Sequence, residues 1–84
     1  MEEMHTATHT IAELKKGEKA VIHTFDLNKI PLKLIELGCF EGSEVEILQK
    51  STLGDPIYLR MNDAYLSIRK EMARAIQVIS KLAS

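Results

Sequence analysis

Apolar and polar residues alternate along several short stretches of the chain, which is the pattern of strands with one buried face. Val45 and Ile47 alternate with Glu44 and Glu46 in this way. Other stretches are short runs of β-branched and apolar residues bounded by Gly, Asn, Asp or Pro. The predicted strands cover residues 19–25, 44–50, 57–61, 66–68 and 76–78. We therefore expect about five short strands.

One segment between the first two predicted strands has helical rather than alternating periodicity. The apolar residues on one of its faces are Ile30, Leu34 and Leu37. Asn28 is a suitable N-cap residue, and Gly38 stands where a left-handed residue would end the helix. We predict a helix over residues 30–37 and expect a single helical turn near residues 69–75.

Short strands joined by tight turns in a chain of 84 residues favour a small barrel, because closure leaves no exposed sheet edge. Residues 1–10 are predicted to be a flexible N-terminal tail because they show no apolar periodicity, and residues 11–80 to be the folded domain. The expected fold is mainly β, a small barrel of about five strands with one short helix between the first two strands.

The charge balance and composition exclude several classes of protein. Eleven basic residues are offset by twelve acidic ones without a basic stripe, which argues against nucleic-acid binding. No apolar run approaches the ~18 residues of a membrane span, so we expect no direct membrane insertion. Cys39 is the single cysteine and the N-terminus does not resemble a signal peptide. We therefore expect a cytoplasmic protein.

Few residues suggest catalysis or metal binding. His5 and His9 have the i, i+4 spacing of a helical metal pair and lie near Glu2 and Glu3. We interpret them instead as solvated tail residues, because closing a flexible pair on an ion costs ordering entropy. Cys39 is interpreted as a small packing residue, because it follows the negative end of a helix, which does not stabilise a thiolate. We expect no enzyme activity, no cofactor and no metal site in the folded part.

Four stretches in order give the chain its resemblance to a known family. They are residues 14–22 (LKKGEKAVI), 34–38 with 42–47 (LIELG and GSEVEI), 53–57 (LGDPI), and 66–71 (LSIRKE), the last followed by Ala73, Ile76 and Val78. In these stretches the chain resembles the FeoA family, small cytosolic companions of the bacterial ferrous-iron transporter FeoB. The resemblance implies an SH3-like barrel.

The resemblance also implies a partner. We expect a non-catalytic adaptor or regulator of the FeoB transporter, whose cytosolic part contains a GTPase domain in that family, and recruitment to the inner face of the membrane by this partner. Direct metal binding, as an iron carrier or sensor, is the alternative, and weak self-association is left open.

The predicted helix has more apolar residues than one core-facing stripe requires. Leu32 and Ile35 lie beside that stripe, and Phe40 extends it beyond the end of the helix. Either a small barrel buries them all, or they form a partner-binding face with Lys33 and Glu36 as its polar rim. We predict the second: Leu32, Lys33, Ile35, Glu36 and Phe40 bind the partner.

Overall fold

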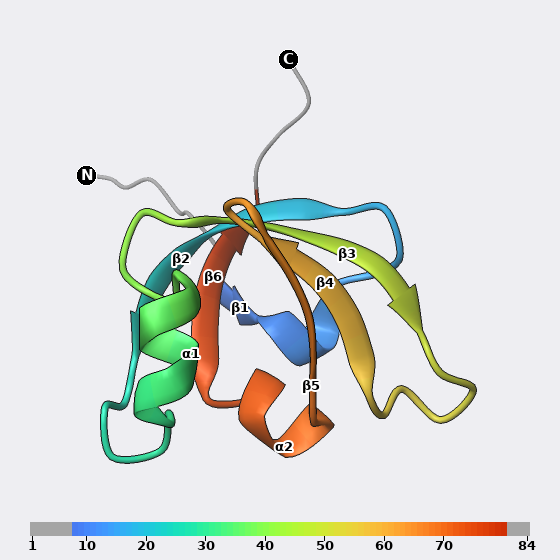
Figure 1. The fold of residues 1–84 in the computed structure, drawn as a ribbon. Helices are drawn as coiled ribbons and strands as arrows, with labels where there is room; N and C mark the ends of the chain where they lie inside the picture. The colour runs from blue at the N-terminus through green and yellow to red at the C-terminus, as the bar shows by residue number, and fades with distance from the viewer. Residues whose placement is uncertain (1–7, 81–84) are drawn as a thin grey trace.

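The computed structural model describes residues 8–80, which form an antiparallel sheet of six strands that curls strongly around its core (Figure 1). The strands are β1 (Thr8–Thr10), β2 (Lys19–Phe25), β3 (Glu44–Lys50), β4 (Ile57–Met61), β5 (Ala64–Ile68) and β6 (Ile76–Ser80). Their order across the sheet is β1-β6-β2-β3-β4-β5. The protein is therefore mainly β, as the alternating pattern predicts.

The prediction of a closed barrel of about five strands is wrong in two respects. β1 is an additional strand within the predicted tail, and Thr8 and Thr10 pair with Ile79 and Gln77 of β6. Within residues 8–80, β1 and β5 do not pair with each other, so the sheet is open between them. A three-residue polar strand leaves no apolar alternation to detect, because its stability comes from hydrogen bonds to β6. Residues 1–7 of the predicted tail lie outside the described residues.

The main helix is shorter than predicted and follows the second strand rather than the first. α1 (Leu32–Leu37) lies between β2 and β3. The residue before it is Pro31 rather than Asn28, because Asp26 accepts the Asn28 N–H at 2.9 Å and holds that segment in a turn. Gly38 ends the helix with a φ of +126°, which a residue with a side chain rarely adopts.

Two shorter helical segments close the lower part of the fold in Figure 1. η1, a 3-10 helix (Ile11–Glu13), follows β1, and α2 (Lys70–Ala73) connects β5 to β6. The expected turn near residues 69–75 is α2. Lys50 of β3 reaches across to η1 and donates hydrogen bonds to the carbonyl oxygens of Ala12 and Leu14, both at 3.0 Å.

The core is formed by side chains from the inner face of the curled sheet, together with η1, α2 and one face of α1. The inward residues of β3 and β4 are those that the alternation predicts. The buried apolar residues are Ile11, Leu14, Ala20, Ile22, Ile30, Leu34, Cys39, Val45, Ile47, Ile57, Leu59, Met61, Ile68, Ala73, Ile76 and Val78.

Candidate partner-binding surface

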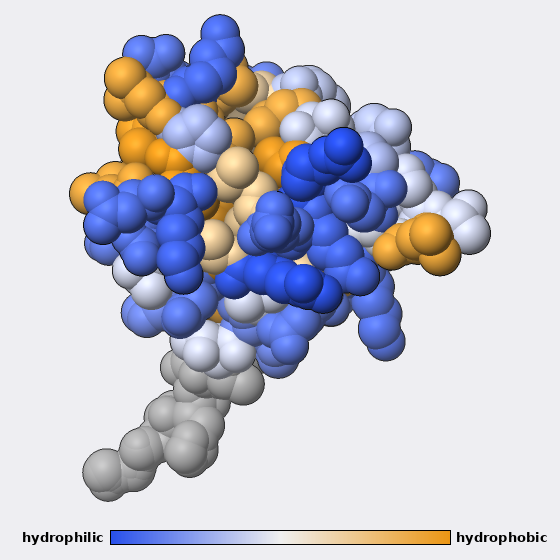
Figure 2. All heavy atoms as spheres, turned by 90° about the horizontal axis from the view of Figure 1, so that it is seen from below, coloured by the Kyte–Doolittle hydropathy of each residue, from blue (hydrophilic) through white to orange (hydrophobic). Residues whose placement is uncertain are grey.

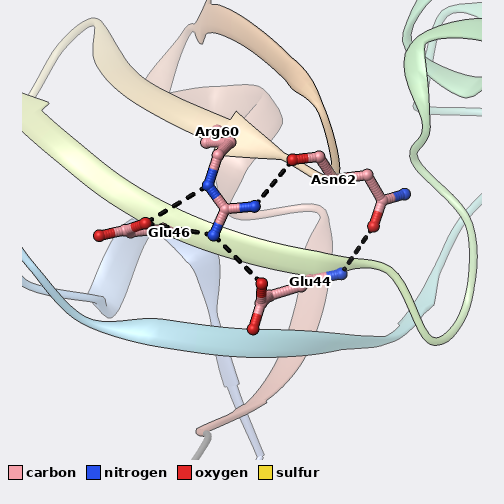
Figure 3. Close-up of polar contacts among 4 residues, drawn as sticks. All are labelled: Glu44, Glu46, Arg60 and Asn62. Carbon is pink, nitrogen blue, oxygen red and sulfur yellow. Dashed lines mark hydrogen bonds and ion pairs between the residues drawn. The ribbon is translucent and has the colours of Figure 1, made fainter.

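The C-terminal end of α1 is fixed to the β4–β5 hairpin by a small polar network. The buried Ser43 hydroxyl donates to the Gly38 carbonyl at 2.6 Å. The Asn62 amide donates to the Ser43 hydroxyl at 3.0 Å and to the Gly38 carbonyl at 3.4 Å. The Asn62 side-chain oxygen accepts the Glu44 N–H at 3.1 Å (Figure 3). Asn62 has a φ of +54°, a left-handed conformation that asparagine tolerates. The network sets where the helix stands relative to the sheet.

The face that α1 turns to the core differs from the predicted stripe by one exchange. Ile30 and Leu34 are buried as predicted, whereas Leu37 is 39% exposed and Ile35 packs partly against the core. The reason is that Ile30 precedes the helix instead of belonging to it. A helical face that includes Ile30 therefore predicts Leu37, instead of Ile35, as the residue that accompanies Leu34 in the core.

The predicted site residues fall into two groups. Leu32 is 68% exposed and Phe40 is 52% exposed, and Lys33 and Glu36 are also at the surface. Ile35 does not belong to this exposed group, because it is half-buried on the side of α1 that packs against the core. The sequence did not predict the exposure of Leu37.

An apolar groove runs between α1 and the segment formed by β5 and α2. Its volume is about 300 Å³, and its lining residues are Pro31, Lys33, Leu34, Leu37, Leu66, Ser67, Ile68, Arg69 and Met72. Hydrophobic surface gathers over α1 at the upper left of Figure 2, with strongly hydrophilic side chains on the neighbouring surface. We call the groove between α1 and the β5–α2 segment the α1–β5 groove.

Basic residues dominate the charge at one end of the α1–β5 groove. The charged residues among the described lining of an adjoining depression are Lys29, Arg69, Arg74 and the acidic Glu71. Arg69 is largely exposed and its guanidinium lies 3.6 Å from the Asp55 carboxylate, a separation at which a solvated ion pair is weak. Arg69 is therefore available to a partner.

A second charged cluster lies on β3 and β4, where the positive charge of Arg60 offsets one of the two carboxylates beside it. Arg60 donates to Glu44 at 3.1 Å, to Glu46 at 3.1 Å and to the Asn62 carbonyl at 2.7 Å (Figure 3). The hydrogen bonds to Glu44 and then Glu46 raise the pKa of Arg60, so the guanidinium stays charged. This arrangement joins β3 to β4.

Of the residues considered for metal or thiol chemistry, the structure describes His9 and Cys39. His9 lies in β1 opposite Val78, a strand rather than the helix that its spacing from His5 suggested, and Glu2, Glu3 and His5 lie outside the described residues. Among residues 8–80 no three His, Cys, Asp or Glu side chains lie together as metal ligands. Burial raises the pKa of the Cys39 thiol to about 11, which fits a packing role.

No helix within the described part of the chain is both long and apolar enough to cross a membrane.

Comparison with known proteins identifies the family. Residues 9–80 match the model of the FeoA domain. The chain belongs to the FeoA family. It is 33% identical over 69 residues to the Fe(2+) transport protein A/Fe(2+) transporter FeoB fusion protein of Porphyromonas gingivalis. That match covers 81% of this chain and 8% of the relative's length.

Solved FeoA structures share the fold. The solution structure of the FeoA-like protein of Clostridium acetobutylicum is 30% identical with a TM-score of 0.82, and the match covers 95% of this chain and 94% of that one. FeoA of Stenotrophomonas maltophilia, a prokaryotic SH3 domain protein solved in complex with zinc, is 27% identical with a TM-score of 0.69. The match covers 87% of this chain and 89% of that protein. The SH3-like fold and the association of the family with ferrous-iron transport are thus confirmed.

Proposed function

We propose that this protein is a non-catalytic cytoplasmic adaptor or regulator of a FeoB-type ferrous-iron transporter and acts by direct protein contact. The observation that carries the proposal is the fusion protein of Porphyromonas gingivalis, in which a related domain and the transporter are one polypeptide. A covalent link keeps two modules at high effective concentration, so it favours pairs that work in contact.

The exposed apolar residues of α1 and the turn after it support a docking role for this part of the molecule. Leu32, Leu37 and Phe40 expose large apolar side chains, and Lys33 and Glu36 lie at the surface beside them. Binding energy in protein interfaces is concentrated in a few such side chains with a polar rim. We name these five residues the α1 surface. Ile35 supports it from beneath.

The test is binding of the full chain to the purified FeoB-type transporter from the same cells, measured by calorimetry in detergent. Leu32→Asp should weaken binding about tenfold or more, because it places a charge in the contact. Its thermal midpoint should match the parent, since Leu32 is largely exposed.

Leu53 supplies a matched control. It is 82% exposed in the β3–β4 turn, on the side of the molecule away from α1 (Figure 1). Leu53→Asp should bind like the parent. If Leu32→Asp also binds like the parent, docking does not use the α1 surface. If the parent itself does not bind the transporter, the proposed function is wrong.

A further inference from the structure

β5 is a sheet edge without the features that normally protect one. In the part of the chain that the structure describes, it pairs only with β4, through five consecutive residue pairs without a register shift. Its sequence, AYLSI, contains no charged residue and no proline. Proteins usually protect an edge strand with charges, proline or a bulge, so β5 is open to pairing with another strand.

The register identifies the backbone groups that are available on this edge. Met61 and Ala64 flank a two-residue turn, and in such a hairpin the flanking residues exchange hydrogen bonds with each other. Along β5 the backbone N–H and C=O groups of successive residues point alternately toward β4 and away from it. Those of Tyr65 and Ser67 therefore point away from β4. Within residues 8–80, no further backbone or side-chain hydrogen bond satisfies them.

The α1–β5 groove lies along the same edge. One wall is the consecutive stretch of residues 66–69, and the facing wall comes from Pro31 and α1. A strand added to β5 would lie about 4.8 Å from it, and alternate side chains of that strand would point toward the core side of the sheet. Leu34, Leu37 and Leu66 in the groove would then contact apolar side chains of the added strand.

The charges around the groove indicate what else the added strand contains. Among the described residues that line the groove, the charged ones are Lys33 and Arg69, and both are basic. Beyond Arg69 the described basic residues Lys29, Lys70 and Arg74 outnumber the described carboxylates, Glu71 and the Asp55 that lies 3.6 Å from Arg69. An acidic segment fits this surface better than a neutral or basic one.

We propose that an extended segment of the partner, with alternating apolar residues and flanking acidic residues, adds as a strand to β5 and fills the α1–β5 groove. This inference rests on the proposed function and specifies its mode of contact. Main-chain hydrogen bonds to Tyr65 and Ser67 hold the segment, the groove selects its apolar side chains, and Lys33 and Arg69 select its carboxylates.

Ser67→Pro tests the strand addition directly. The Ser67 N–H points outward, so proline there removes no hydrogen bond to β4 while it blocks the free edge. Binding to the purified transporter should weaken about tenfold or more, the loss expected for a missing hydrogen bond together with the bulk of the ring. Ser67→Ala keeps the N–H and should bind within about twofold of the parent.

Amide exchange of the unmodified chain keeps the proposal falsifiable if Ser67→Pro fails to fold. The complex with the transporter is labelled in deuterated buffer, and the released chain is read by two-dimensional NMR. The Tyr65 and Ser67 amides should exchange rapidly in the free chain and slowly in the complex. If the transporter binds but both amides stay fast, strand addition is wrong and the proposed function stands.

A charge-reversal pair tests the acidic character of the segment. Lys33→Glu should weaken binding about tenfold, whereas Lys16→Glu, an exposed lysine in the turn before β2, should change it less than about twofold. Equal effects of the two variants would overturn the acidic assignment. Protection of Tyr65 and Ser67 in a dimer of the chain alone, unchanged when the transporter is added, would show that a second copy occupies the edge instead.

Discussion

Asn62→Gly should lower the free energy of unfolding by about 2 kcal/mol. The substitution keeps the left-handed backbone, because glycine adopts a φ of +54° without strain. It removes the side-chain bonds to the Glu44 N–H at 3.1 Å and to the Ser43 hydroxyl at 3.0 Å, and a longer one to the Gly38 carbonyl. Each of the two shorter bonds contributes about 1 kcal/mol, and the third adds little at 3.4 Å.

Urea denaturation followed by circular dichroism measures this loss of free energy. In a thermal melt of a chain of this size, the same loss should lower the melting temperature by about 8–16 °C. Asn62→Ala removes the same bonds and also forces a residue with a side chain into the left-handed region, so it should cost about 1 kcal/mol more. Asp63→Ala is the control in the same turn: Asp63 is exposed, and its replacement should stay within about 0.5 kcal/mol of the parent.

Stability should decrease in the order parent, Asn62→Gly, Asn62→Ala. This order distinguishes the contribution of the Asn62 side-chain hydrogen bonds from that of the left-handed backbone conformation in the turn. If only the backbone conformation mattered, glycine would match or exceed the parent and alanine alone would be destabilised. A parental denaturation midpoint for Asn62→Gly would therefore refute the claim that the side chain of Asn62 holds the end of α1.

Further expectations concern Lys50 and Cys39. Lys50→Met should cost about 1–3 kcal/mol in urea denaturation, because it removes the ammonium group that binds the carbonyls of Ala12 and Leu14, while Lys16→Met should cost less than about 0.5 kcal/mol. The folded-state pKa of Cys39 is raised to about 11 from 9.0, so its stabilising contribution is complete below pH 9 and is lost as the pH rises to 11. The stability advantage of the parent over Cys39→Ala should accordingly shrink by about 2–3 kcal/mol across that range, and a constant difference would contradict the burial of a neutral thiol.

The sequence predicts the strands well wherever one face of the strand is buried. Val45, Ile47, Ile57, Leu59 and Met61 all lie in the core, as their alternation with polar residues requires. Alternation reports burial on one face directly, so β3 and β4 are predicted at their observed bounds.

The parts that the sequence does not predict depend on contacts between distant segments. β1 exists because β6 offers it hydrogen bonds, and Thr8 and Thr10 carry no local sign of that pairing. The start of α1 depends on the turn that Asp26 stabilises, which displaces Ile30 from the helix. As a result Ile35 packs against the core and Leu37 is exposed, the reverse of the predicted arrangement. The number of apolar residues in the segment is the same in both arrangements, so counting them cannot distinguish the two.

The open edge that makes the barrel prediction wrong is also what forms the candidate docking surface. Closing the barrel would require β5 to pair with β1, but β1 has three residues and pairs with β6. Among residues 8–80, the outer backbone groups of β5 therefore stay unpaired, and an apolar groove lies between β5 and α1. An uncharged edge beside apolar surface invites association, and a partner strand would satisfy both the backbone groups and the groove. In this way the break in the sheet gives the proposed adaptor a means of contact that a closed barrel would lack.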